Sequence, residues 1–184
     1  MPDKNVRVPP LAVEHFTAEQ AALVGDWKHL NFSRVLIHSP RMYRTFVTHL
    51  AELVARTILP PRDRQIVCLR MLQLCDEVYE KTHHITISRK AGLSEQDIEA
   101  IMQGQGACLS AFDTTVVKAT DELFRDQRIS DATWEALAQR YSQQQLMEIV
   151  FLAGCYQTMA MLTKSFGIQL EPDLESFNAL RKYA

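Results

Sequence analysis

The fold prediction rests on the sequence from Arg62 to His84, which reads Arg-Asp-Arg-Gln-Ile-Val-Cys-Leu-Arg-Met-Leu-Gln-Leu-Cys-Asp-Glu-Val-Tyr-Glu-Lys-Thr-His-His. Its first half, to Leu74, is rich in large apolar residues without strand alternation, which favours a central core helix. Its second half, from Cys75, brings a thiol, carboxylates, a phenol and two imidazoles into about three helical turns. We therefore expect a core helix followed directly by a helix that carries a cluster of proton-transferring side chains.

The spacing of these polar side chains predicts that they gather on adjoining helix faces. Glu77, Glu80 and His84 are spaced i, i+3 and i+7, so they share one face. Tyr79 and His83 are spaced i and i+4 and share a neighbouring face. Because carboxylates and an imidazole in one site push their pKa values apart, general acid–base chemistry is the first interpretation.

Two other interpretations of the cluster stay open. It is either a solvated surface group or a metal site, since Glu-x-x-x-His places two ligands on one side of a helix. A surface cluster is less expected because the apolar helix directly before it implies burial nearby. A metal is less expected because no second Glu-x-x-His pair is present to complete a two-metal site. Nearby Arg64 and Arg70 are either solvated charges or a clamp for an anionic substrate, whereas Arg62 is expected to be solvated.

The rest of the chain also predicts helices, so the expected fold class is all-α. Six glycines and seven prolines are few, and no segment alternates like a strand. Ser39-Pro40 and the capping boxes at Thr17 and Ser94 begin helices, and Pro60-Pro61 ends one. Asp76 is a candidate N-cap of the next helix, and Gly92 and Gly167 are expected to end helices. The expected helices run from Thr17 toward Leu30, from Ser39 to Pro60, and over about 62–74, 77–92, 94–102, 109–126, 130–140 and 143–165, with a less certain one after Pro172-Asp173.

A chain of 184 residues is expected to form one domain. Residues 1–13 read as an N-terminal arm, because Pro9-Pro10 bars an early helix, and residues 14–184 as a single helical domain. A faint internal repeat pairs Ile66–Gly92 with Ile149–Gly167. In the second copy the stretch beginning Cys155-Tyr-Gln stands where the first carries its acids and imidazoles.

The composition argues against several classes of partner. Hydrophobic residues make up 47% of the chain, charged residues 23%, and the net charge is −2. Without a basic excess, nucleic acids and anionic membranes are poor partners, so a small-molecule substrate is expected. The N-terminus has no apolar signal region, and no apolar run approaches transmembrane length, so we expect a cytoplasmic protein.

The four cysteines are widely spaced, and none forms a Cys-x-x-Cys pair. In a reducing compartment such residues are usually small buried hydrophobes. Cys68 and Cys155 lie in apolar runs and fit that description. Cys75 is the exception, because it borders the polar cluster.

The ordered set of motifs resembles the carboxymuconolactone decarboxylase family, which also contains the AhpD-type alkylhydroperoxidases. The resemblance covers about residues 31–172. It is carried by Leu59-Pro-Pro-Arg-Asp-Arg-Gln-Ile-Val67, Cys75–His84, Arg89-Lys-Ala-Gly-Leu-Ser94, Asp97–Ile101, Asp131–Leu137 and Gln145–Ile149. It implies an AhpD-like helical bundle that assembles into homotrimers or homohexamers.

The resemblance also assigns positions within the cluster. The peroxidase branch uses a Cys-x-x-Cys pair, a relay Glu one helix earlier and a His four residues after the second cysteine. With His84 on that His, Glu77 and Glu80 take the cysteine positions, Tyr79 the relay His between them, and Gln65 the relay Glu. Glutamates form neither a disulfide nor a sulfenic acid, and Gln does not relay a proton as a carboxylate does.

The leading hypothesis is therefore a lyase of the decarboxylase type, without cofactor or metal, that acts on a small carboxylated or lactone-like metabolite. His84 would be the general base or acid, with Glu80 orienting it or sharing its proton. Tyr79 or His83 would donate to a developing enolate, and Arg64 or Arg70 would hold a carboxylate. The alternatives are a peroxidase with peroxiredoxin-like activity that uses Cys75, and a helical oligomer without catalysis.

Overall fold

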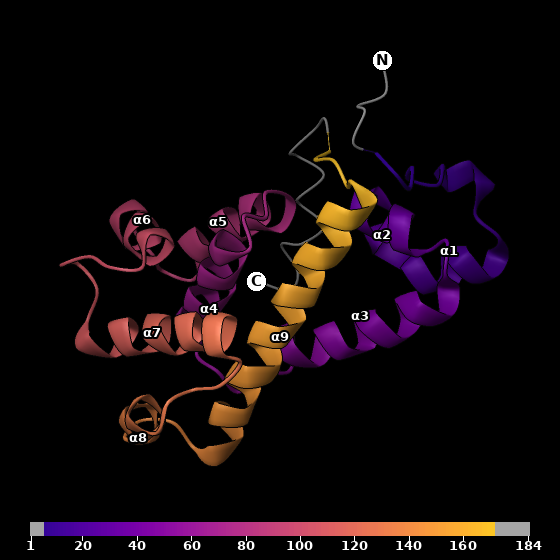
Figure 1. Cartoon of the computed structure of the whole chain (residues 1–184). Coiled ribbons are helices and arrows are strands. Elements are labelled where there is room, and N and C mark those ends of the chain that lie inside the picture. Colours follow the sequence, from indigo (N-terminus) through magenta and orange to yellow (C-terminus); the bar gives the residue numbers. More distant parts are fainter. Residues whose placement is uncertain (1–5, 172–184) are drawn as a thin grey trace. The chain divides into compact units, whose positions relative to one another are not determined.

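A computed structural model describes residues 6–171 of the chain, and helices joined by loops make up this part (Figure 1). Its nine α-helices and two short 3-10 helices confirm the all-α prediction. The tail helix expected after Pro172 lies outside the described residues. Contacts group the chain into two compact units, one formed by the residues up to Arg56 and from Met161 onward, the other by Thr57–Ala160. The single-domain expectation stays a prediction.

The first unit contains η1 (Val13–His15), α1 (Ala18–Val24), η2 (Gly25–His29), α2 (Asn31–Leu36) and α3 (Pro40–Val54). The predicted capping box begins α1, with the Gln20 N–H donating to Thr17 Oγ1 at 3.2 Å. The helix expected to continue toward Leu30 ends at Val24, because Gly25 leaves the helical region with a φ of +53°. Both α1 and α2 pack against α3 around a core of Val24, Ile37 and Tyr43.

The second unit is built around α4 (Pro61–Leu74). Three helices pack on α4, namely α5 (Tyr79–Lys90), α6 (Glu95–Gln103) and α7 (Ala111–Asp126), and α8 (Asp131–Ala138) packs on α7. Every residue from Asp63 to Leu69 is buried, so α4 has no solvent face over these two turns. The core-helix prediction is thus confirmed, and polar residues of α4 are forced to find partners on its neighbours.

Two acidic residues between α4 and α5 act differently: one forms the turn and the other caps α5. Asp76 turns the chain with a left-handed φ of +49°. The buried Glu77 carboxylate then accepts the N–H groups of Tyr79, Glu80 and Lys81 at 2.9, 2.8 and 3.1 Å. The sequence suggested Asp76 as the cap, which is wrong, because the turn at Asp76 brings Glu77 to the first N–H groups of α5.

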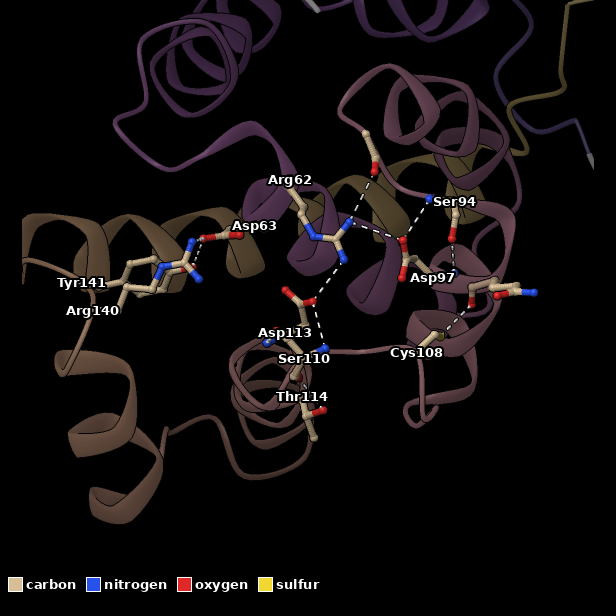
Figure 2. A network of polar contacts seen from close by, with 12 residues as sticks. Arg62, Asp63, Ser94, Asp97, Cys108, Ser110, Asp113, Thr114, Arg140 and Tyr141 are labelled. Carbon is tan, nitrogen blue, oxygen red and sulfur yellow. Dashed lines mark hydrogen bonds and ion pairs between the residues drawn. The ribbon is translucent and has the colours of Figure 1, made fainter.

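Arg62 fixes the amino ends of three helices in the network that Figure 2 shows. Its guanidinium donates to Asp113 at 3.1 Å and to Asp97 at 3.4 Å. Asp97 and Asp113 are the N3 residues of the capping boxes that Ser94 and Ser110 begin. The expectation of a solvated Arg62 is wrong, because one guanidinium at the start of α4 serves carboxylates at the starts of α6 and α7.

The last helix, α9 (Gln143–Phe166), begins in the second unit, and its residues from Met161 belong to the first. Gly167 ends it with a φ of +70°, as the sequence predicts. Its best 18-residue window has a mean hydropathy of 1.4 and is half buried. Contrary to the sequence expectation, α9 is thus long and apolar enough to cross a membrane by length and composition, a test that core helices of soluble proteins also meet.

Candidate functional site

Three helices of the second unit meet at the imidazole of His84. The Nδ1 atom of His84, on α5, lies 2.7 Å from Oε1 of Gln65, on α4. Its Nε2 atom lies 2.8 Å from the hydroxyl of Tyr156, on α9. All three side chains are at most 4% exposed. The helix that the sequence marked as functional is therefore buried at this point, and His84 has a partner on each ring nitrogen.

These contacts fix the state of the His84 ring. Because a carbonyl oxygen only accepts, Nδ1 carries the hydrogen and donates it to Gln65, and Nε2 accepts the hydroxyl hydrogen of Tyr156. The Tyr156 ring meets the imidazole edge to face, with centroids 4.8 Å apart. Burial, helped by the nearby charges of His83 and Arg64, lowers the pKa of His84 to about 3. His84 is thus a neutral imidazole at physiological pH.

Gln65 accepts a second hydrogen bond on the same oxygen, from the Ser88 hydroxyl at 3.3 Å. The Nε2 atom of Gln65 is buried and has no hydrogen-bond partner within residues 6–171. A buried amide nitrogen without a partner costs free energy of folding, about 1–3 kcal/mol. It is also an unused donor immediately beside His84.

On the far side of the network, Tyr156 adjoins two thiols. The Tyr156 hydroxyl is hydrogen-bonded to Cys68, and burial raises the pKa of both groups above their usual values. Burial, followed by the nearby Glu80 carboxylate, raises the pKa of Cys155 to about 12. Cys68 and Cys155 are therefore buried, protonated thiols, as expected from their apolar sequence context.

Two charged residues of opposite sign border the same network. The Glu80 carboxylate is close enough to raise the pKa of Tyr156, and Arg64 is close enough to lower that of His84. Both residues are at most 9% exposed. Charged side chains are seldom buried to this degree, and groups with perturbed pKa values concentrate at functional sites.

The second predicted face also forms. Tyr79 and His83 are buried, and their rings meet edge to face with centroids 4.4 Å apart. The i, i+4 spacing on α5 is the direct cause of this contact. The site thus holds both predicted faces of α5, together with Gln65 and Arg64 from α4.

The remaining candidates, Glu77 and Arg70, make contacts that hold helices together. Glu77 caps α5, as described above. Arg70 donates to the Asp121 carboxylate at 2.5 Å and to the Met102 carbonyl at 2.6 Å, which ties α4 to α7 and to the end of α6. Gly104 suits this position, because its φ of +82° strains other residues and a Cβ would lie 2.5 Å from Nη2 of Arg70. Arg70 is therefore held by the scaffold, whereas Arg64 lies close enough to His84 to lower the pKa of its imidazole.

The thiol of Cys75 lies at the carboxyl end of α4. It is half-buried, with its sulfur 4.0 Å from the sulfur of Met71. No disulfide is present in the described part of the chain. Among residues 6–171, no group of three or more His, Cys, Asp or Glu side chains is placed to hold a metal ion.

Sequence reasoning missed Tyr156, although it completes the His84 network. Tyr156 is 72 residues from His84 and lies in an apolar run, where a tyrosine normally serves packing. The faint internal repeat was the one available signal, because it paired the stretch beginning at Cys155 with the cluster. It carried no information on which side chain would reach His84.

Residues 40–122 match the model of the carboxymuconolactone decarboxylase family. Over these residues the chain is therefore similar to that family. The match spans α4, α5 and α6 and includes every candidate site residue except Tyr156. No curated protein matches the chain.

Solved structures share the AhpD-like fold at low identity. An AhpD-core, peroxidase-related protein from Ralstonia eutropha JMP134 has a TM-score of 0.81 at 14% identity, over 95% of this chain and 96% of its own. A putative antioxidant defence protein AhpD from Agrobacterium tumefaciens has a TM-score of 0.68 at 17% identity, over 75% and 96%. The debrominase Bmp8 has a TM-score of 0.76 at 14% identity, over 99% and 100%. At these identities the likeness shows the fold alone.

Proposed function

We propose that this protein is a cofactor-free acid–base enzyme of the carboxymuconolactone decarboxylase family, acting on a small carboxylated or lactone-type metabolite. The observation that carries the proposal is the buried group of Glu80, Arg64 and neutral His84 around one hydrogen-bond network. A carboxylate and an imidazole in one water-poor site are suited to move protons to and from carbon.

The geometry supports a distribution of roles. Glu80 is the candidate group that takes a proton from the substrate, and Arg64 is the candidate partner for a substrate carboxylate. The unused Nε2 donor of Gln65 suits a substrate oxygen that gains negative charge. His83 and Tyr79 remain further candidates for this donation. His84 has both nitrogens engaged within the protein, which favours an action through its partners over direct contact with the substrate.

Thiol chemistry is disfavoured by the state of the cysteines. Burial raises the pKa of the Cys68 thiol and that of Cys155, and the thiolate is the reactive form. Glu77 and Glu80 occupy the positions that the resemblance assigns to a redox pair. The peroxidase hypothesis therefore depends on Cys75, the thiol that borders the cluster in the sequence.

Proton abstraction is tested directly by hydrogen–deuterium exchange. A panel of small lactone-carboxylates and keto-carboxylates in D₂O is followed by proton NMR at the carbon next to the carbonyl, together with release of CO₂. The wild type should accelerate exchange of at least one compound, and Glu80→Gln should lose about 100-fold or more of that rate. The matched control is Glu135→Gln, an exposed glutamate of α8, which should keep the wild-type rate.

Equal rates for Glu80→Gln and the wild type would remove Glu80 from the mechanism. Consumption of hydrogen peroxide that disappears in Cys75→Ser, without any proton exchange, would instead support the peroxidase hypothesis. No reaction in either assay, with an intact fold, would favour the non-catalytic oligomer.

The proposal includes a homo-oligomer, trimeric or hexameric, in the cytoplasm. Supporting it, Met147, Val150 and Phe151 project from α9 with 41–55% of their surface exposed. Gly154 lies in the same helix, and a Cβ there would meet no atom within 4 Å. A glycine inside a helix costs about 1 kcal/mol relative to alanine. A second α9 helix approaching closely at Gly154 would explain both features.

Light scattering coupled to gel filtration tests this part of the proposal. Phe151→Glu should lower the oligomer to a smaller species, because it places a charge in the apolar contact. Met42→Glu, at a similarly exposed apolar residue of α3, is the matched control and should leave the mass unchanged. A wild-type protein that is monomeric at micromolar concentration would contradict the proposal.

A further inference from the structure

We propose that Gln65 and Tyr156 together hold His84 as the neutral tautomer with its hydrogen on Nδ1, so that His84 exchanges protons only through Nε2 and the Tyr156 hydroxyl. Tyr156 is thereby a positioning residue and the link between His84 and the rest of the site. The chemical use of this link rests on the proposed function, whereas the tautomer and its two partners are testable without any substrate.

The Nδ1 side of the ring is closed to proton exchange. Its partner, Oε1 of Gln65, lies at 2.7 Å and also accepts from Ser88 at 3.3 Å. An amide oxygen in this position holds a hydrogen in place, but it does not take the proton away, because a protonated amide is a very strong acid. Gln65 and Ser88 are at most 1% exposed, so bulk water does not replace them at Nδ1.

The Nε2 side is the open one. Tyr156 donates to it at 2.8 Å and is itself hydrogen-bonded to Cys68. Glu80 lies near enough to act on Tyr156 electrostatically. Among residues 6–171, the hydroxyl is therefore the only group bonded to His84 that is able to both release and regain a proton.

The proposed proton transfer passes through the Tyr156 oxygen. When the substrate or a neighbouring acid gives a proton to the Tyr156 oxygen, that oxygen releases its own hydrogen to Nε2 of His84. One O–H bond breaks and one forms at Tyr156, and one N–H bond forms at His84, which becomes an imidazolium that still donates Nδ1–H to Gln65. The reverse transfer restores the neutral ring. Burial, followed by the nearby charges of His83 and Arg64, disfavours the imidazolium relative to the neutral ring.

The arrangement is read directly by long-range ¹H–¹⁵N NMR on protein labelled with ¹⁵N-histidine. The chain has six histidines, and the loss of signals in His84→Gln assigns those of His84. In the wild type, near neutral pH, His84 should show a protonated Nδ1 and an unprotonated, hydrogen-bonded Nε2. This measurement needs no variant to fold beyond the one used for assignment.

Tyr156→Phe keeps the ring contact and removes the hydroxyl. The Nε2 resonance of His84 should then move downfield, toward the position of a nitrogen without a hydrogen bond, while Nδ1 stays protonated. Tyr43→Phe is the matched control, since Tyr43 is also buried and donates to a neutral group, Ser33, at 3.2 Å in the other unit. It should leave the His84 signals unchanged.

Gln65→Glu tests the closed side. A carboxylate at the same position stabilises the imidazolium, so the pKa of His84 should rise by about 1 to 3 pH units above its wild-type value. Gln103→Glu, on the exposed side of α6, should have no such effect.

Three results would overturn the inference. They are a wild-type His84 protonated on Nε2, a Tyr156→Phe spectrum identical to that of Tyr43→Phe, and a Gln65→Glu variant whose His84 titrates as in the wild type. If proton-exchange activity is absent from the wild type but the NMR results hold, the proposed function fails and the positioning of His84 stands. If activity is present, Tyr156→Phe should lower kcat with little change in KM.

Discussion

Two polar networks begin on α4, three residues apart. One pairs a charged side chain with charged partners, and the other pairs a neutral side chain with neutral partners. At Arg62 the partners are charged, and the guanidinium bridges Asp97 and Asp113 at the edge of the fold (Figure 2). At Gln65 the partners are neutral, and the chain of hydrogen bonds runs through His84 to Tyr156 in the interior.

Solvent access explains the difference. The Arg62 side chain is 32% exposed, so water supports its charge and the bridge to two capping carboxylates is tolerated. At the depth of Gln65 and His84 an unpaired charge would carry a large desolvation cost, and the imidazole stays neutral. The first network therefore stabilises helix ends. The second holds the uncharged His84 imidazole near the buried Glu80 carboxylate. The comparison predicts different responses to pH and to mutation.

The largest expected effect is a pH dependence of stability that comes from His84. Its folded-state pKa of about 3 lies below the ordinary value of 6.5, so between these values the unfolded chain binds a proton that the folded chain does not. Stability should thus fall as the pH drops below 6.5, by about 2.5 kcal/mol between pH 7 and pH 4.5 for this group.

Urea unfolding over this range measures the effect. His84→Gln should lack this part of the slope, and His29→Gln, an exposed histidine of the first unit, should keep it. A wild type whose free energy of unfolding is flat from pH 7 to pH 4.5 would show that His84 is not buried as a neutral group.

A smaller effect is expected from breaking the Arg62 network. Burial by itself would raise the pKa of Asp97, yet the hydrogen bonds from Ser94 and Arg62 hold that pKa below its usual value. Arg62→Met leaves two capping carboxylates without their cation and should lower the free energy of unfolding by about 1.5 kcal/mol at neutral pH. Part of this difference should disappear in high salt, as expected for a partly exposed pair.

Thermal unfolding at low and high salt checks this prediction. Arg89→Met removes an exposed arginine, paired with Glu95 on the surface, and should leave the melting temperature unchanged. Equal losses in the two variants would mean that Arg62 is no more important than a surface charge.

The smallest expected effects on the free energy of unfolding come from replacing one serine in each network. Ser94 caps α6 and accepts the Asp97 N–H at 3.1 Å, so Ser94→Ala should lower the free energy of unfolding by about 1 kcal/mol. Ser88 donates to Gln65 at 3.3 Å, but Gln65 keeps its bond from His84, so Ser88→Ala should lower it by about 0.5 kcal/mol. Denaturant midpoints of the two variants give the comparison, and a larger loss for Ser88→Ala would reverse the ranking of the two networks.

Most of the fold followed from local chemistry in the sequence. Capping boxes at Thr17 and Ser94, the proline at position 40 and the glycines at 92 and 167 each marked a helix boundary that the structure has within a few residues. These signals are readable because a cap or a left-handed glycine acts on its own helix end. The cap of α5 was misassigned between Asp76 and Glu77, since the choice depends on a backbone turn that no spacing rule specifies.

The sequence predicted only part of the candidate site. The spacing of Glu80, His83 and His84 on α5 predicted which side chains share a face, and the structure buries all three. The roles of the arginines were not predictable, because Arg64 and Arg70 are both on α4, and only the packing of α6 and α7 engages Arg70 with Asp121 and Met102.

The sequence by itself determined the all-α class, the core helix α4 and the cluster of proton-transferring side chains on α5, because helix periodicity and capping depend on residues only a few positions apart. The tertiary structure decided the state of that cluster. It brings Tyr156 from 72 residues away to one nitrogen of His84 and Gln65 to the other, and it removes water from both. Protonation and proton pathway depend on such long-range contacts and on burial, which no local pattern in the sequence encodes.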